Sequence, residues 1–200
     1  MSEAIEFYFD FSSPYGYLAA QTVEAMGDGA GRPVIWKPFL LGAVFSQEGS
    51  KPLIDYPLKG EYSLHDMKRT ARRIGVPFTM PAPFPFASVA AGRAFYALTD
   101  EWPEEAKRLA LGFYEAIFGR GIALNSAESV LTVAAELGQD AEALGQAMMA
   151  PALKARFRQE VETAVARGVF GSPFFFVDGE AFWGHDRMAQ VEDWAKSGGW

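Results

Sequence analysis

The 200-residue chain contains no cysteine. A protein without cysteine has no disulfide, no thiolate ligand for a metal, no dithiol redox pair and no cysteine nucleophile of its own. Only two histidines are present, His65 and His185, so a histidine-rich metal site is not expected. A Ser-His-Asp triad is possible by count, but neither histidine lies in a local motif that supports one.

The chain also lacks long apolar runs and an excess of basic residues. No apolar stretch reaches the roughly 18–20 residues that span a bilayer, so no membrane partner is expected. The N-terminal "MSEAIEFYFD" has neither the basic region nor the apolar core of a secretion signal. The net charge of −7 disfavours binding to a phosphate backbone, so no nucleic-acid partner is expected. With half of its residues hydrophobic, the chain has enough apolar surface for a sizeable core.

The first 45 residues read as strand, helix, strand. "AIEFYFDF" (4–11) is typical of a buried strand, and a helical pattern follows from Pro14 to about Met26. "GDGAGRP" (27–33) is expected to be a loop, and "VIWKPFLL" (34–41) a second strand. A right-handed crossover would make these two strands parallel.

The middle of the chain is predominantly helical. "SQEGSKPLIDYPLKG" (46–60) is expected to be an irregular connection, residues 61–75 a helix, and the proline-rich 77–86 irregular again. Further helices are predicted at about 87–99, 103–119, 126–137, 140–149 and 151–167.

The C-terminal part returns to strands. Strands are predicted at 174–177 and 181–183, joined by an Asp178-Gly179 hairpin turn, and a helix at 187–196. The order β-α-β, helices, β-β-α is the thioredoxin plan with an insertion. We therefore predict an α/β fold with a discontinuous thioredoxin-like domain (1–45 and 168–200) and an all-helical insertion domain (46–167).

Two landmarks of that plan contain serine and proline. Ser13-Pro14-Tyr15-Gly16 occupies the place where a DsbA-type oxidoreductase has Cys-Pro-x-Cys, and "GSPFFF" precedes the third strand. Dithiol exchange is impossible with Ser13 and Gly16 in place of the cysteines. A serine before a proline is also the ordinary cap of a helix, so a structural role for Ser13 is the alternative.

The sequence resembles the 2-hydroxychromene-2-carboxylate isomerases, which are relatives of the kappa-class glutathione transferases. The resemblance rests on "FYFDFSSPYGYLA", "PFLLGAVF", "KPLIDYPLKGEY", "GVPFTMP" and "FGSPFFFVDGEAFWGHDRM", and covers nearly the whole chain. It implies glutathione as cofactor. Because glutathione supplies the sulfur, the chain needs no cysteine, and Ser13 at a helix N-terminus would stabilise the borrowed thiolate.

The resemblance also implies where glutathione binds. The backbone at a cis Ser172-Pro173 peptide would pair with its cysteinyl part, and His185 and Asp186 would hold its γ-glutamyl end. The family often has serine or asparagine where this chain has His185. Asp186 is alternatively a residue that complements a helix dipole.

Two further residues belong to the expected glutathione site. Lys59 matches a lysine that reaches a carboxylate in the relatives, although a solvated loop charge is the alternative. Ser50 falls where the relatives often have asparagine. Phe39, Leu40, Trp183 and residues 82–86 could line an apolar pocket, with plain core as the alternative.

The implied activity is glutathione-dependent isomerisation of 2-hydroxychromene-2-carboxylate, or a related aromatic carboxylate, to trans-o-hydroxybenzylidenepyruvate by transient thiolate addition. One alternative is a kappa-like glutathione transferase or peroxidase. Another is a redox-inactive thioredoxin-like module that binds partners. The resemblance further implies a homodimer, and the missing signal together with glutathione dependence implies a cytoplasmic location.

Overall fold

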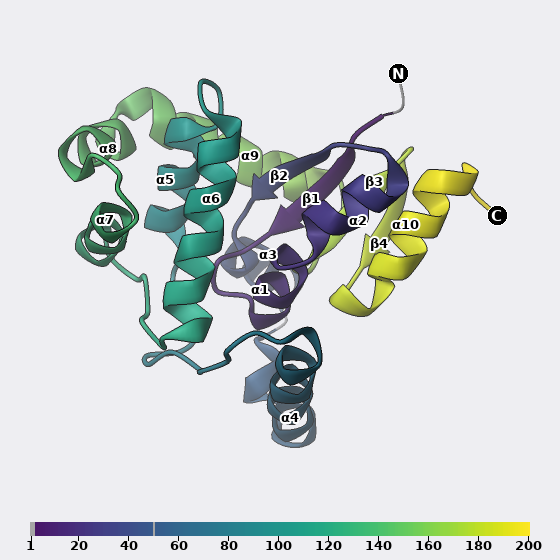
Figure 1. The fold of residues 1–200 in the computed structure, drawn as a ribbon. Helices are drawn as coiled ribbons and strands as arrows, with labels where there is room; N and C mark the ends of the chain where they lie inside the picture. The colour runs from purple at the N-terminus through teal and green to yellow at the C-terminus, as the bar shows by residue number, and fades with distance from the viewer. Residues whose placement is uncertain (1–2, 50) are drawn as a thin grey trace.

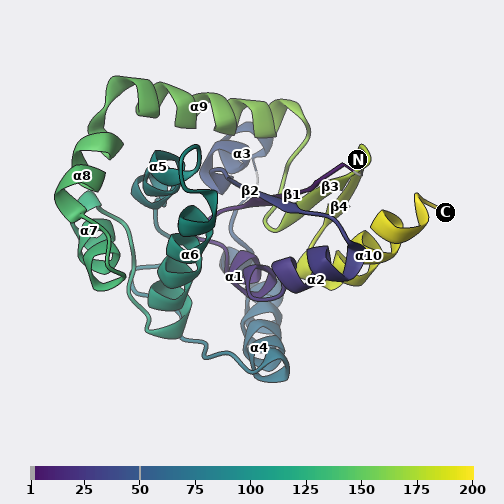
Figure 2. The same cartoon turned by 45° about the horizontal axis from the view of Figure 1, so that its top comes forward.

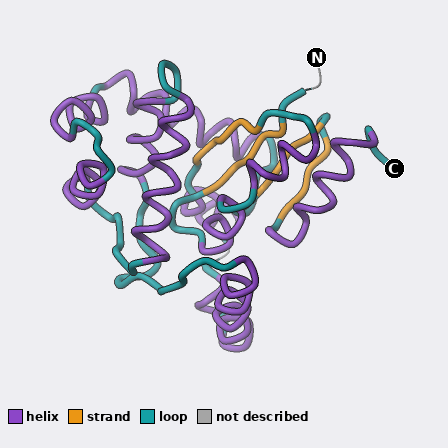
Figure 3. The backbone as a smooth tube through the Cα atoms, in the orientation of Figure 1, coloured by secondary structure: helices purple, strands orange, loops and turns teal. Residues whose placement is uncertain are grey.

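A four-stranded mixed sheet forms the centre of the computed structural model, which describes residues 3–49 and 51–200 (Figure 1). The strand order is β2-β1-β3-β4, with β1 and β2 parallel and the other pairs antiparallel (Figure 3). The strands are β1 (Ile5–Phe9), β2 (Val34–Pro38), β3 (Phe174–Val177) and β4 (Glu180–Trp183). This topology confirms the predicted thioredoxin-like plan.

Aromatic side chains pack the inner face of the sheet. Phe7 pairs with Trp36 on β2 and with Phe175 on β3, and its ring centroid lies 5.1 and 5.4 Å from theirs. These side chains are at most 3% exposed. Alternating residues of a strand face the same side, so the aromatic-rich β1 sequence places Ile5, Phe7 and Phe9 together in the core.

The first crossover contains two helices where the sequence predicted one. The first, α1, spans Pro14–Ala20, and α2 spans Val23–Ala30. The predicted loop at 27–33 was therefore too long, because α2 continues through Gly27 to Ala30 and is capped by Gly31 in the left-handed conformation. A side chain at position 27 would collide with Val34, so this glycine permits close packing of α2 on β2 rather than forming a loop.

The segment after β2 is more regular than predicted. The second strand ends at Pro38 instead of Leu41, and α3 (Leu41–Glu48) follows directly. A short 3-10 turn, η1 (Leu53–Asp55), leads into α4 (Pro57–Ile74), which begins four residues before the predicted start at 61. Pro57 occupies the first turn of α4, where its missing N–H costs no hydrogen bond.

Helices α5–α8 lie together on one side of the sheet, and α9 runs from them back toward β3 (Figures 1 and 2). Their positions agree with the predicted segments, and residues 77–86 are irregular as predicted. The bounds are α5 Val89–Leu98, α6 Pro103–Tyr114, a π-helical turn η2 Glu115–Gly119, α7 Ala127–Glu136, α8 Ala141–Met149 and α9 Pro151–Ala166. The division into domains at residues 45/46 and 167/168 stays a prediction.

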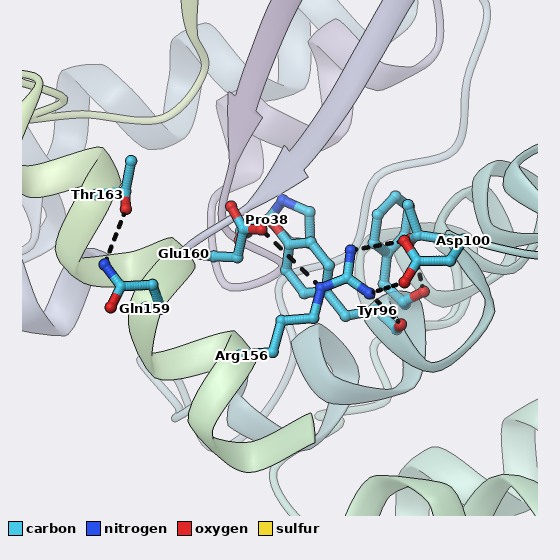
Figure 4. A network of polar contacts seen from close by, with 9 residues as sticks. Pro38, Tyr96, Asp100, Arg156, Gln159, Glu160 and Thr163 are labelled. Atoms are coloured by element: carbon cyan, nitrogen blue, oxygen red, sulfur yellow. Dashed lines mark hydrogen bonds and ion pairs between the residues drawn. The ribbon is translucent and has the colours of Figure 1, made fainter. Parts of the chain in front are cut away.

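A polar network attaches the helical segment to the end of β2 (Figure 4). The Tyr96 hydroxyl donates to the Pro38 carbonyl at 3.1 Å, and Arg156 on α9 pairs with Asp100 at 2.6 Å. The Arg156 guanidinium also lies 5.0 Å from the centre of the Tyr96 ring. The helices are thereby held against the sheet at the end where β1 leads into the candidate site.

The C-terminal hairpin confirms the Asp178-Gly179 turn. Both residues have positive φ, 52° and 84°, which the two-residue turn between β3 and β4 requires. A 3-10 turn, η3 (His185–Arg187), and helix α10 (Met188–Ser197) complete the chain, with α10 beside α2. No helix in the described part of the chain is long and apolar enough to cross a bilayer.

Candidate functional site

Ser13 caps helix α1 in the structure, as the structural alternative predicted. Its side-chain oxygen accepts a hydrogen bond from the Gly16 N–H at 3.0 Å, and its backbone is extended. The Ser13 N–H donates to the Asp10 carbonyl at 2.8 Å, so the turn between β1 and α1 is closed. The cap does not exclude a catalytic role, because it places the hydroxyl at the positive end of the helix dipole.

The loop before β3 lies against this helix end. The Ser13 hydroxyl donates to the Ser172 carbonyl at 2.8 Å, and the Ser172 hydroxyl accepts from the Asp10 N–H at 2.9 Å. The peptide between Ser172 and Pro173 is cis. The Pro173 carbonyl in turn accepts from the Gly184 N–H at 3.0 Å, which joins this loop to η3. The structure thus brings together the two landmarks that are 159 positions apart in the sequence.

Close packing leaves no room for a side chain at Gly16, the position where DsbA-type proteins have their second cysteine. A Cβ atom on Gly16 would lie 2.5 Å from the Tyr114 hydroxyl and 2.9 Å from the Ser172 hydroxyl. Tyr114 is fully buried and donates to the Asp10 carbonyl at 2.9 Å. The site has therefore lost not only the second thiol but also the space that a side chain would need there.

Asp10 is a buried carboxylate that was not predicted from the sequence. One of its oxygens accepts from the N–H and hydroxyl of Ser12 and from the Ser88 hydroxyl at 2.6 Å. The other accepts from the Leu41 N–H at 2.6 Å, at the start of α3. Burial raises the pKa of Asp10, although the bonds from Ser88 and Ser12 oppose this. An acidic residue directly after an apolar strand was the only sequence signal for this role.

A cleft of about 1290 Å³ opens above these groups. It is bounded by the start of α1, by η1 and α4, and by the segments 170–173 and 183–189. All but one of the site residues expected from the sequence line it: Ser13, Lys59, Ser172, Pro173, His185 and Asp186. Ser50 lies outside the described residues.

The η3 end of the cleft carries charges of both signs. His185 is partly buried, and burial lowers its pKa although Asp186 and Asp66 oppose the change. Asp186 is exposed, with an Arg187 nitrogen 3.5 Å from its carboxylate. A lowered pKa keeps the His185 ring neutral near pH 7, so the ring can donate or accept a hydrogen bond without adding charge.

Helix α4 forms the opposite wall of the cleft. Only one residue of this wall, Lys59, was predicted from the sequence. The cleft-lining residues of α4 with polar side chains are Lys59, Tyr62, Asp66, Arg69, Thr70 and Arg73, and all but Thr70 recur every three or four positions, as residues on one helix face do. The Tyr15 hydroxyl on α1 donates to the Asp66 carboxylate at 2.7 Å, which holds the two walls together.

Apolar groups also line the cleft. The Trp183 ring is 52% exposed, and its centroid lies 4.9 Å from that of Phe170. Phe84 and Pro85 also line the cleft, as predicted for an aromatic pocket. Phe39, however, is only 2% exposed and belongs to the core, where its ring packs on Tyr8, so for this residue the alternative of plain core is confirmed.

The chemistry open to this cleft is limited by its residue types. Among residues 3–49 and 51–200 no group of three or more acidic or histidine side chains could hold a metal ion. The cleft instead offers a hydroxyl at a helix N-terminus, cations that suit carboxylates, and carboxylates that suit an ammonium group. Side chains of these types can bind a small molecule that carries both carboxylates and an ammonium group.

Comparisons with known proteins agree with the fold and the site. Residues 4–195 match the family model of the DSBA-like thioredoxin domain. The chain is 30% identical to 2-hydroxychromene-2-carboxylate isomerase of Sphingobium xenophagum over 97% of this chain and 98% of that protein. It is 25% identical to Glutathione S-transferase kappa 1 of Homo sapiens, covering 94% of this chain and 88% of that one.

A solved structure of selenomethionine 2-hydroxychromene-2-carboxylate isomerase superposes with a TM-score of 0.84 at 30% identity. The match covers 95% of this chain and 93% of that chain. These relatives support an isomerase or glutathione-related activity. The chain therefore belongs to the 2-hydroxychromene-2-carboxylate isomerase family, within the DsbA-like proteins of thioredoxin fold.

Proposed function

We propose that this protein is a glutathione-dependent isomerase of 2-hydroxychromene-2-carboxylate or a related aromatic carboxylate. The observation that carries the proposal is the Ser13 hydroxyl, which lies at the N-terminus of α1, faces Ser172 and lines the cleft in a chain without cysteine. The names of the relatives support both the reaction class and the cofactor.

The residues of the cleft fit the groups of glutathione. Glutathione carries two carboxylates, one ammonium group and one thiol. Lys59 would bind one carboxylate, Asp186 would bind the ammonium group, and His185 would donate a hydrogen bond at the same end. Ser13 would hold the sulfur, and the backbone of Ser172 would pair with the cysteinyl part.

Glutathione held by Ser13, Ser172, Lys59 and Asp186 would supply a thiolate for reversible addition to the conjugated double bond of the ring-opened substrate. After rotation about the resulting single bond, breaking the same carbon–sulfur bond would release the thiolate and restore the double bond as trans. The Ser13 hydroxyl has a single proton with which to stabilise the thiolate. That proton is directed at the Ser172 carbonyl at 2.8 Å, so it must turn to the sulfur when the thiolate binds. The Gly16 N–H continues to point at the Ser13 oxygen and holds it in place.

The same geometry explains why a hydroxyl suffices. A free thiol has a pKa of about 8.5, so only a few per cent is ionised at pH 7. One hydrogen bond and the positive end of α1 would lower the thiol pKa to between about 6.5 and 7.5. The aromatic surface of Trp183 and Phe170 would face the ring of the substrate.

A kappa-like transferase is the second candidate, because human Glutathione S-transferase kappa 1 matches over 94% of this chain. Both candidates use the same thiolate but differ in its fate. An isomerase returns free glutathione after each turnover, whereas a transferase leaves a conjugate and a peroxidase leaves a disulfide.

The test is a turnover assay with 2-hydroxychromene-2-carboxylate and substoichiometric glutathione, followed by mass spectrometry. Many turnovers per glutathione, with no conjugate accumulating, support the isomerase. One conjugate or disulfide per glutathione consumed would favour the transferase or peroxidase. Absence of glutathione binding at millimolar concentration in calorimetry would exclude both and leave a redox-inactive binding module.

A further inference from the structure

At the η3 end of the cleft, one cationic residue has no partner among the described side chains. Arg73, near the end of α4, lines the cleft and lies within 4 Å of no described carboxylate. The other charged groups there are paired. Asp66 accepts from Tyr15 and pairs with Arg69 at 2.7 Å, and Asp186 lies 3.5 Å from Arg187.

Arg73 lies on the same helix face as the other polar residues of the cleft wall. It follows Arg69 by four positions and Asp66 by seven, so the three side chains share one side of α4. That side faces η3 across the cleft, and the positive charge of Arg73 contributes to the lowered pKa of His185. Arg73, His185 and Asp186 therefore surround one end of the cleft.

A basic residue in the last turn of a helix also complements the helix dipole, which is the simpler explanation of Arg73. Arg72 meets that condition equally well: it lies in the same last turn and is exposed, but it does not line the cleft. The dipole therefore accounts for a basic residue in this turn, but not for the position of Arg73 opposite His185.

We propose that Arg73 binds the α-carboxylate of the γ-glutamyl residue of glutathione, while Asp186 binds its ammonium group. This inference rests on the proposed function. A guanidinium matches a carboxylate with two parallel hydrogen bonds, which an ammonium group cannot do. Arg73 and Asp186 together would recognise a zwitterionic amino-acid head and so select γ-glutamyl thiols from thiols without one.

The test compares two ligands and two variants by calorimetry. The ligands are reduced glutathione and 4-aminobutyryl-cysteinylglycine, which differs only by lacking the α-carboxylate. We expect Arg73→Gln to weaken glutathione binding about 10-fold and to leave binding of the analogue unchanged. Arg72→Gln removes the same charge from the same turn outside the cleft, and should change neither affinity. Arg73→Lys keeps the charge without the fork and should recover part of the loss.

Several results would overturn the inference. If Arg73→Gln weakened the binding of glutathione and of the analogue equally, the effect of the substitution would be structural. If Arg73→Gln left the affinity for glutathione unchanged, Arg73 would not bind the cofactor. An unchanged glutathione affinity with a raised KM for the aromatic carboxylate would assign Arg73 to the substrate instead. Failure of the wild-type protein to bind glutathione would refute the proposed function itself, and this inference with it.

Discussion

The Ser13 hydroxyl donates a hydrogen bond of 2.8 Å to the main-chain oxygen of Ser172 while its own oxygen accepts from the Gly16 N–H. Both capacities of the hydroxyl are thus used within the protein. A thiolate bound here would compete with the Ser172 carbonyl for the Ser13 hydroxyl proton. It would not displace the Gly16 N–H, because that group donates to a lone pair of the Ser13 oxygen. The same residue can therefore be a helix cap and a thiolate donor.

Ser13→Ala should separate these two roles. Loss of the cap should lower the free energy of unfolding by about 1 kcal/mol. Loss of the thiolate hydrogen bond should lower kcat/KM by about 8- to 25-fold at pH 7, because a thiol pKa that returns from between about 6.5 and 7.5 to about 8.5 leaves that much less of the thiol ionised. Urea unfolding and steady-state kinetics measure the two effects.

A matched control exists in α7. Ser126 caps that helix through the Ser129 N–H at 3.1 Å and is exposed, outside the cleft. Ser126→Ala should cost about the same stability and leave kcat/KM unchanged. If Ser13→Ala behaves like Ser126→Ala in both measurements, Ser13 is only a cap.

Gly16→Ala should destabilise the protein although alanine is the better helix former. The new methyl group would overlap the Tyr114 hydroxyl, and such overpacking typically costs about 1–3 kcal/mol. Gly42→Ala in α3, where a Cβ meets nothing within 4 Å, should instead be neutral or stabilising.

A double-mutant cycle locates the cause of the Gly16 effect. Tyr114→Phe removes the hydroxyl that the new methyl group meets, so the double variant should be less destabilised than the sum of the single variants, by at least about 0.5 kcal/mol. Simple additivity would show that the overlap with Tyr114 does not determine the cost.

Lys59→Gln should weaken glutathione binding only about two- to fivefold. Lys59 is exposed, and its amino group lies 5.5 Å from the centre of the Tyr56 ring, so water screens its attraction for a bound carboxylate. Lys68→Gln, on the same helix but outside the cleft, is the control in the same calorimetric titration. Equal affinities for the two variants would remove Lys59 from the site.

The acid sensitivity of the fold should depend on Glu6. Burial alone would raise the pKa of Glu6, but hydrogen bonds from Arg167 and Lys37 outweigh it and lower the pKa to about 2. A lowered pKa means that the ionised form stabilises the fold at pH above about 4.5, and that this stability is lost as the pH falls toward 2.

Glu6→Gln removes the titration but keeps a similar shape. The free energy of unfolding of the wild type should therefore exceed that of this variant by a constant amount near neutral pH, and the difference should shrink between about pH 4.5 and pH 2. Urea unfolding of both proteins at pH 7, 4.5 and 3 measures it. A difference that does not change with pH would show that Glu6 is not held ionised by these contacts.

The features predicted correctly from the sequence are those with local causes. The Asp178-Gly179 turn requires two residues that tolerate positive φ, and the sequence has them side by side. The Ser13-Pro14 helix start is likewise encoded in adjacent residues. Such elements do not depend on what packs against them.

The features that were missed depend on tertiary contacts. Gly27 looked like a loop residue until Val34 was seen to occupy the space of its side chain. Asp10 fell within the predicted strand 4–11, although β1 ends at Phe9, because nothing in the sequence places Ser88 and the Leu41 N–H around its carboxylate. Arg72 and Arg73 are indistinguishable in the sequence, and only the position of α4 relative to η3 separates them.

The most direct test of the account is the thiol pKa of glutathione bound to the protein, measured from thiolate absorbance at 240 nm across pH under saturating conditions. We expect a pKa between about 6.5 and 7.5 for glutathione bound to the wild type, and a return toward about 8.5 in Ser13→Ala. A bound thiol that titrates at about 8.5 or above in the wild type would contradict the claim that Ser13 and the N-terminus of α1 stabilise a borrowed thiolate.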